Sequence, residues 1–230
     1  MTYLPFKLIR MEEVNLIIKE KAKELVRGAL SEHELSENIN NFVRDSILYC
    51  LDEWDVKPIE VLKKGRGMCA GKALLAAELH GAVGISTRFK VMKILGEGGL
   101  FDFAMRQLEE CEYSYLSLGE KERLKEAILS LPPDRDHIIL QVLLDGQWID
   151  FDLARDTELD HGMRLLGIWK ERKIVSEEGV FDSLDQWIEE RMQRRTVLKD
   201  REIFFKVMNE QIEMIRSVGI TGLKQGLRLE

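Results

Sequence analysis

The sequence contains no apolar run that approaches the roughly 20 residues needed for a membrane-spanning helix. Its first residues, MTYLPFKLIRMEEV, lack the basic start and the uninterrupted apolar stretch of a secretory signal. These two absences predict a cytoplasmic protein with no membrane partner. Proline is scarce, at four residues, and no segment rich in proline and serine separates one part of the chain from another. We therefore expect residues 1–230 to form a single domain.

Positive charge is in deficit, because 34 Lys and Arg residues stand against 41 Asp and Glu residues and leave a net charge of −7. No long basic stripe offsets this balance, so nucleic acid is not an expected partner. Cysteine is also scarce, since Cys50, Cys69 and Cys111 are an odd number at wide spacings without a CxxC motif. This pattern fits neither a disulfide framework nor a zinc knuckle. We expect free thiols, no metal and no other cofactor.

The pattern of apolar residues indicates helices, then strands, then helices again. Helical spacing is found in residues 11–30, 31–51, 58–64, 69–83 and 100–131, and again beyond about residue 160. Alternation predicts a strand over 85–95 and a second strand region over 137–154. Gly96, Gly98 and Gly99 predict a flexible loop after the first strand. This order of elements is that of an α+β protein, and without a linker the C-terminal helices should pack on the same body.

The second strand region contains Asp145-Gly146, a pair typical of a two-residue hairpin turn. With this turn, the directly opposed pairs are Leu143 with Trp148, Gln141 with Asp150, and Ile139 with Asp152. One face of the hairpin is then wholly apolar and should be buried, whereas the other collects every polar residue of the two strands. On that polar face, His137 and Asp152 are diagonal neighbours, so an imidazole and a carboxylate can meet.

Cys69 stands at the start of the predicted helix 69–83, among the glycines of GRGMCAG. A cysteine in the first turn of a helix meets unpaired backbone N–H groups and the positive end of the helix dipole, and both favour the thiolate. The neighbouring glycines allow close approach of a carbonyl substrate that main-chain donors would bind. Alternatively, Cys69 is a small buried residue where the helix docks, and this reading is preferred for Cys50 and Cys111.

His137 is the histidine best placed to act as a base, since Asp152 would orient one ring nitrogen and leave the other free. His80 follows Cys69 on the same predicted helix, but lies about 16 Å from it by helical rise. Nothing in the sequence orients the remaining two histidines, His33 and His161. The candidate substrate-binding residues are Gly67, Gln141 and Trp148.

Two runs of the sequence, GRGMCAGKALLAAELHGAVGISTRF and HIILQVLLDGQWIDFD, resemble elements of the transglutaminase-like superfamily. In that family a glycine-flanked Cys opens an Ala- and Leu-rich helix that leads into a strand, and a His, a turn with Gly, a Trp and an Asp follow. The resemblance covers about residues 40–156. It implies a papain-like α+β core whose Cys helix packs on an antiparallel sheet, with a helical insertion at about 96–136 and a helical extension over 160–230. It also implies a catalytic triad of Cys69, His137 and Asp152.

The expected function is cysteine-dependent acyl transfer on a peptide or other amide. Water as acceptor gives a peptidase or amidase, which the resemblance favours, and an amine gives a protein-glutamine transglutaminase. A non-catalytic binding module is an alternative, because Ile139 and Gln141 occupy positions where family members often carry an aromatic and an acidic residue. A Cys/His/Asp metal site is disfavoured, since no further ligand lies at short spacing. Lys72, near Cys69, is expected on a solvated surface.

Overall fold

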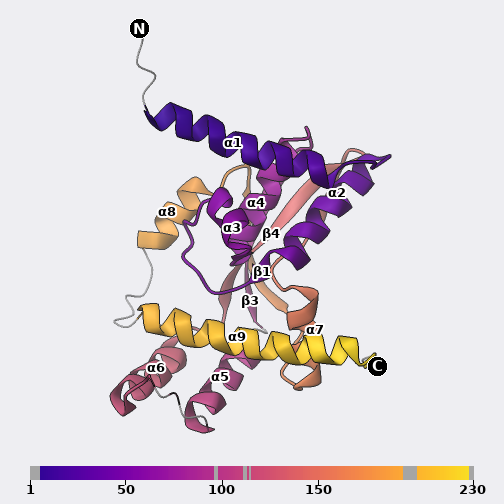
Figure 1. Ribbon diagram of the computed structural model, residues 1–230. Helices are drawn as coiled ribbons and strands as arrows, with labels where there is room; N and C mark the ends of the chain where they lie inside the picture. Colours follow the sequence, from indigo (N-terminus) through magenta and orange to yellow (C-terminus); the bar gives the residue numbers. More distant parts are fainter. Residues whose placement is uncertain (1–5, 96–97, 111–112, 114, 194–200, 228–230) are drawn as a thin grey trace.

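The computed structural model describes residues 6–95, 98–110, 113, 115–193 and 201–227, which form helices around an antiparallel sheet (Figure 1). The helices are α1 (Phe6–Leu25), α2 (Glu32–Asn41), α3 (Pro58–Lys64), α4 (Cys69–Gly81), α5 (Gly98–Glu110), α6 (Leu118–Ser130), α7 (Thr157–Leu165), α8 (Asp185–Gln193), α9 (Arg201–Lys224) and the π-helical turn η1 (Phe42–Ser46). The strands are β1 (Leu48–Tyr49), β2 (Arg66–Gly67), β3 (Thr87–Leu95), β4 (Arg135–Leu144), β5 (Gln147–Phe151) and β6 (Lys173–Phe181). Four of them form a sheet in the order β5-β4-β3-β6, in which neighbours are antiparallel. The predicted α+β class is confirmed.

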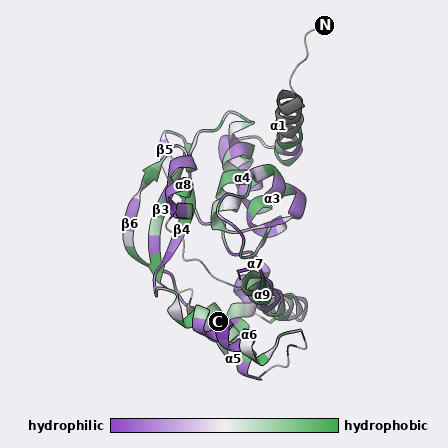
Figure 2. Ribbon diagram, turned by 90° about the vertical axis from the view of Figure 1, so that its left-hand side faces the viewer, coloured by the Kyte–Doolittle hydropathy of each residue, from purple (hydrophilic) through white to green (hydrophobic). Residues whose placement is uncertain are grey.

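The Cys-bearing helix α4 packs on one face of the sheet, and Figure 2 shows it on that side together with α3. Its buried side chains share a hydrophobic cluster with β3 and β4. The members from α4 are Ala70, Ala73, Leu75, Ala76 and Leu79, and those from the strands include Phe89, Val91, Ile138, Leu140 and Val142. Because small alanine side chains allow close approach in a densely packed interior, an Ala-rich segment suits the helix nearest the sheet. This is the predicted arrangement of the core.

The hairpin of β4 and β5 has the predicted register. Its turn residues Asp145 and Gly146 both have positive φ, at 49° and 77°, as a tight turn between twisted strands requires. Gln141 pairs with Asp150, and on the predicted apolar face the β4 side chains are buried, whereas Ile149 and Phe151 of β5 are half-buried. Pairing between β4 and β5 ends at Leu140 and Phe151, so the first residues of β4 extend beyond β5.

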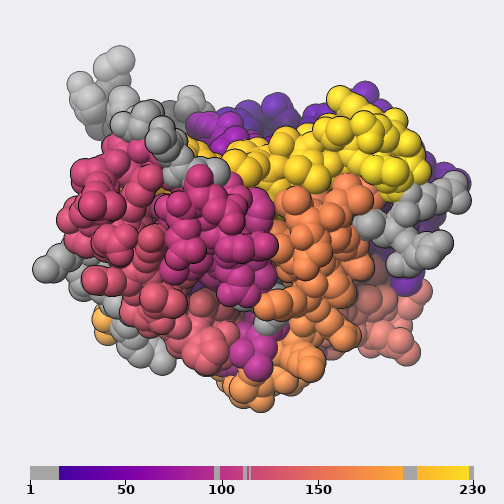
Figure 3. Space-filling model, turned by 90° about the horizontal axis from the view of Figure 1, so that it is seen from below, coloured from indigo at the N-terminus to yellow at the C-terminus, as the bar shows by residue number. Residues whose placement is uncertain are grey.

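A second hydrophobic cluster joins α5, α6, α7 and α9 below the sheet, and Figure 3 shows the face that these helices form. The crossing of α7 and α9 depends on two glycines. A Cβ atom at Gly162 would lie 2.0 Å from the carbonyl oxygen of Ile215, and one at Gly219 would lie 1.9 Å from that of Glu158. Larger residues would therefore separate the two helices.

Several predicted element boundaries are wrong, among them that of the helix over 100–131, which is divided into α5 and α6. Gly98 and Gly99 belong to α5 rather than to a loop, whereas Gly96 lies outside the described residues. A Cβ atom at Gly99 would lie 1.9 Å from the carbonyl oxygen of Ile168, so this glycine serves close packing rather than flexibility. The helix predicted over 31–51 ends at Ser46, because β1 pairs in parallel with β2 immediately afterwards.

The C-terminal extension, predicted to be helical throughout, contains a strand. Residues 173–181 form β6, which pairs with β3 at the edge of the sheet. Most β6 side chains are exposed, so burial imposes no alternation on the sequence KIVSEEGVF and the strand went unpredicted. The extension contacts the rest of the chain through β6 and through α9. In the described part of the chain, no helix is both long and apolar enough to cross a lipid bilayer.

Candidate active site

Cys69 is the first residue of α4 and is 6% exposed. Met68, the residue at the N-cap, makes no side-chain hydrogen bond to the first turn, so no capping side chain occupies the N–H groups near the thiol. Cys69 packs with Met68 and with Ala154, which follows β5. The thiol therefore lies where the helix meets the chain segment that leaves the hairpin.

His137 lies near the start of β4, beyond the last residue that pairs with β5, and is 5% exposed. Its Nε2 atom is 3.0 Å from Oδ2 of Asp152, the predicted diagonal contact. Burial opposes charge on this imidazole, but hydrogen bonds with Asp152 and Cys69 favour the charged form and raise the pKa of His137 to about 9. The imidazolium therefore persists at neutral pH.

Asp152 links the imidazole of His137 to the backbone of Ala154. Its Oδ1 atom accepts a hydrogen bond of 3.1 Å from the backbone N–H of Ala154, the residue that packs on Cys69. Its Oδ2 atom accepts hydrogen bonds from His137 and from Arg172. Burial opposes ionisation of this carboxyl group, but the contacts with His137, Arg172 and Ala154 hold its pKa well below the usual range. Asp152 is thus a fixed carboxylate partner of the imidazole.

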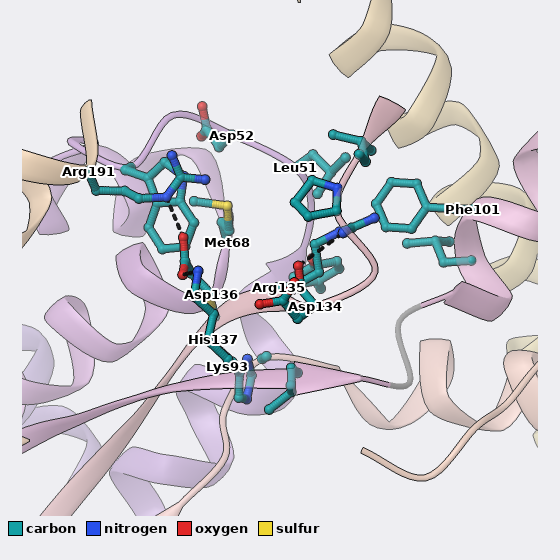
Figure 4. A pocket seen from close by; sticks show the side chains of 18 of the residues that line it. Leu51, Asp52, Met68, Lys93, Phe101, Asp134, Arg135, Asp136, His137 and Arg191 are labelled. Atoms are coloured by element: carbon teal, nitrogen blue, oxygen red, sulfur yellow. Dashed lines mark hydrogen bonds and ion pairs between the residues drawn. The ribbon is translucent and has the colours of Figure 1, made fainter. Parts of the chain in front are cut away.

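A cavity of about 370 Å³ is lined by both Cys69 and His137 (Figure 4). Its other lining residues come from β1 and the segment after it, from Met68, from β3, α5, β4, β6, α8 and α9, and from the segments between α6 and β4, after β5 and before β6. Figure 4 shows Leu51 and Phe101 on the side of the cavity opposite Arg191 and Asp136. The thiol and the imidazole therefore share a concave site that is lined by both apolar and charged side chains.

A family model for the transglutaminase-like superfamily matches residues 19–153, more than half of the chain. The chain belongs to this superfamily. Similar solved structures are a "putative cysteine protease" from Cytophaga hutchinsonii, at 12% identity and a TM-score of 0.45, and a "putative protease" from Parabacteroides distasonis, at 11% and 0.40. Each similarity covers 74% of this chain but only 43% and 28% of those chains, so this chain spans less than half of either. No curated protein matches it.

The three predicted substrate-binding residues do not line the cavity of this transglutaminase-like chain. A Cβ atom at Gly67 would lie 2.9 Å from the Val61 side chain, so this glycine makes room for α3. Gln141 accepts a hydrogen bond of 2.7 Å from Arg88, whose guanidinium stacks 4.1 Å from the Trp148 ring. These two residues stabilise the outer face of the sheet instead.

Lys72 was expected in solvent and is instead fully buried. Its ammonium group donates hydrogen bonds of 3.0 Å to the carbonyl oxygens of Arg44 and Ala154. Burial lowers its pKa to about 8, against the opposing attraction of Asp156. Lys72 therefore links α4 to the segment that carries Asp152, because it donates a hydrogen bond to Ala154, two residues after Asp152.

Arg172 is a site residue that the sequence did not reveal. It lies between α7 and β6, lines the cavity and contacts Asp152. In the sequence it is one of several charges in WKERK, and no periodicity marks which of them faces inward. Only the tertiary structure shows that Arg172, like His137, contacts the carboxylate of Asp152.

Cys50 and His80 do not line this cavity. Cys50 is buried, and burial with the nearby charge of Asp52 raises its pKa to about 11. Cys111 lies outside the described residues. His80 is buried against Ser36 and Ala76, and burial lowers its pKa to about 4. Among the described residues, no group of three or more His, Cys, Asp or Glu side chains is arranged to hold a metal ion.

Asp152→Asn is expected to lower the pKa of His137 well below 9, because burial then opposes the imidazolium without its carboxylate partner. In the native protein the folded-state pKa exceeds the ordinary value of 6.5. Protonation of His137 therefore stabilises the fold below about pH 6.5, and this contribution is lost as the pH rises through about 9. An NMR titration of the imidazole resonances measures both values, with His80 as the unaffected reference. A His137 pKa that stays near 9 in Asp152→Asn would contradict the assignment.

Proposed function

We propose that this chain is a cysteine hydrolase that cleaves a peptide or related amide through Cys69, His137 and Asp152. The observation that carries the proposal is that one cavity contains the thiol and an imidazole whose charged form is stabilised by Asp152 and Cys69. A thiol beside an oriented imidazole is the arrangement that nucleophilic catalysis requires.

In the proposed reaction, the Cys69 thiolate attacks the amide carbon and a tetrahedral intermediate forms. The C–N bond then breaks, the His137 imidazolium gives its proton to the departing amine, and a thioester remains on Cys69. Water next attacks the thioester and its proton passes to His137, so that a carboxylic acid leaves and the starting state returns. Asp152 holds the imidazole in position throughout.

We propose two N–H groups as the donors that stabilise the oxyanion. The backbone N–H of Cys69 is at the first turn of α4, where no side-chain cap uses the free donors. Trp54 also lines the cavity and is held by edge contact with the Trp187 ring, at a centroid distance of 5.3 Å. We assign the Trp54 indole N–H as the second donor, since an indole can donate a hydrogen bond and cannot accept one.

The proposal is tested by the rate of alkylation of each cysteine with iodoacetamide at pH 6, followed by mass spectrometry of the peptides. We expect Cys69 to react at least about tenfold faster than a free thiol, because only thiolates react and an ordinary thiol is almost fully protonated at this pH. Cys50 is the internal control and should stay unmodified, since its pKa is about 11 and it is buried. If Cys69 reacts no faster than a free thiol, a non-catalytic module is the better account.

A further inference from the structure

Four apolar side chains from separate parts of the chain are only partly buried at the cavity of Cys69 and His137. They are Leu51, Phe101, Leu131 and Phe205. These residues belong to the β1–α3 segment, to α5, to the C-cap of α6 and to α9. Single exposed apolar residues are ordinary, but several that converge in one concave place form a contiguous apolar surface. We call these four residues the apolar wall.

The apolar wall is held in position by its own contacts. The guanidinium of Arg135, two residues before His137, lies 4.9 Å from the centre of the Phe101 ring. The guanidinium of Arg201 lies 5.1 Å from the Phe205 ring and donates a hydrogen bond of 2.7 Å to Glu53. A wall fixed before binding loses little conformational entropy when a ligand arrives.

Four of the five described Lys and Arg side chains that line the same cavity are paired with carboxylates, and the fifth, Arg135, donates a hydrogen bond of 3.1 Å to the backbone carbonyl of Asp134 and lies over the Phe101 ring. Lys93 and Arg191 both contact Asp136, Arg172 contacts Asp152, and Arg201 contacts Glu53. A charged substrate group would compete with these carboxylates for the cations, whereas an apolar group only has to displace water. The cavity therefore favours an apolar ligand over an anionic one.

We propose that the apolar wall binds an aliphatic or aromatic side chain of the substrate, adjacent to the carbonyl group that Cys69 attacks. The inference rests on the proposed function and adds the chemical class of the substrate. Phe205 lies in α9, beyond the residues that the family model matches, whereas the other three wall residues lie within them.

The test compares three iodoacetamides of similar shape, with N-isobutyl, N-carbamoylmethyl and N-carboxymethyl substituents, on the native chain of residues 1–230. For each, the alkylation rate of Cys69 is divided by the rate of a small free thiol. We expect the N-isobutyl reagent to be favoured about tenfold over the other two, since burial of a branched aliphatic group at a partly open wall is worth at least that factor.

Two leucines at the end of α6 provide a matched pair of variants. Leu131→Asn places a polar group in the wall at the C-cap of α6, and should remove most of the preference. Leu129→Asn alters a side chain that is 73% exposed and does not line the cavity, and should leave the preference unchanged.

The outcomes separate the two proposals. Rapid alkylation of Cys69 without preference for the N-isobutyl reagent would overturn the apolar site and leave the hydrolase intact. A preference for the N-carboxymethyl reagent, or equal loss in both leucine variants, would also overturn it. Slow alkylation by every reagent would overturn the hydrolase proposal. The ratio of the Cys69 rates with the N-isobutyl reagent and with the two polar reagents would still test whether the apolar wall prefers an apolar group.

Discussion

Cys69→Ala is expected to abolish turnover, with a loss of about a thousandfold or more in kcat, because no other described residue that lines the cavity carries a thiol that can form the thioester. The measurement is release of 7-amino-4-methylcoumarin from a set of peptide amides that covers all classes of side chain. The fold should persist, since the substitution removes one sulfur atom from a small cluster with Met68 and Ala154. Retained turnover in Cys69→Ala would exclude this residue as the nucleophile.

Two further variants complete this experiment. Cys50→Ala removes a buried thiol that does not line the cavity, and should retain turnover. His137→Gln should lose about as much activity as Cys69→Ala, and the double variant should be no worse than either alone. Residues that act as a unit are non-additive in this way, whereas independent contributions would multiply. A multiplicative loss would therefore contradict a shared catalytic role.

Arg216→Met is expected to destabilise the fold by about 3–5 kcal/mol, because it leaves the carboxylate of Asp156 buried without its cation. The two side chains are 2% and 1% exposed, and the guanidinium donates two hydrogen bonds to the carboxylate, of 3.1 and 2.8 Å. Asp156 also accepts hydrogen bonds from the backbone of Tyr49 and of Leu159. The pair thus joins β1, α7 and α9, and urea denaturation measures the cost.

The matched control is Arg164→Met. Arg164 pairs with Asp160 at 2.9 Å, but the two side chains are 40% and 32% exposed, so solvent screens the pair. We expect a cost below about 1 kcal/mol. Equal costs for the two arginine variants would mean that the buried pair contributes no more than a surface pair. Because Tyr49 lines the cavity, Arg216→Met should also slow alkylation of Cys69.

The contact between His137 and Asp152 was predictable because it follows from local rules. The Asp145-Gly146 turn determines the register of the hairpin, and the register determines which residues become neighbours. The position of Cys69 was predictable for a similar reason, since a helix start is visible in the sequence around it. The triad as a reacting unit stays a proposal, as does the division into a core over 40–156 and an extension over 160–230.

The surroundings of the triad were not predictable, because they depend on contacts between distant segments. Lys72 is buried only because the carbonyl groups of Arg44 and Ala154 converge on it. Arg172 reaches Asp152 from a charged segment without periodicity. Gly67 was predicted to bind substrate. A glycine is required there because any side chain would collide with Val61 on α3. Each case requires the position of a partner far away in the chain.

The match to the family model stops at residue 153, one position after Asp152. A polypeptide trimmed at that point would keep the sulfur, the imidazole and the carboxylate. It would lose Ala154, which accepts a hydrogen bond from Lys72, as well as Arg172 and the whole of α9. Excision studies should therefore retain the chain to the end of α9, so that these contacts around the site are kept.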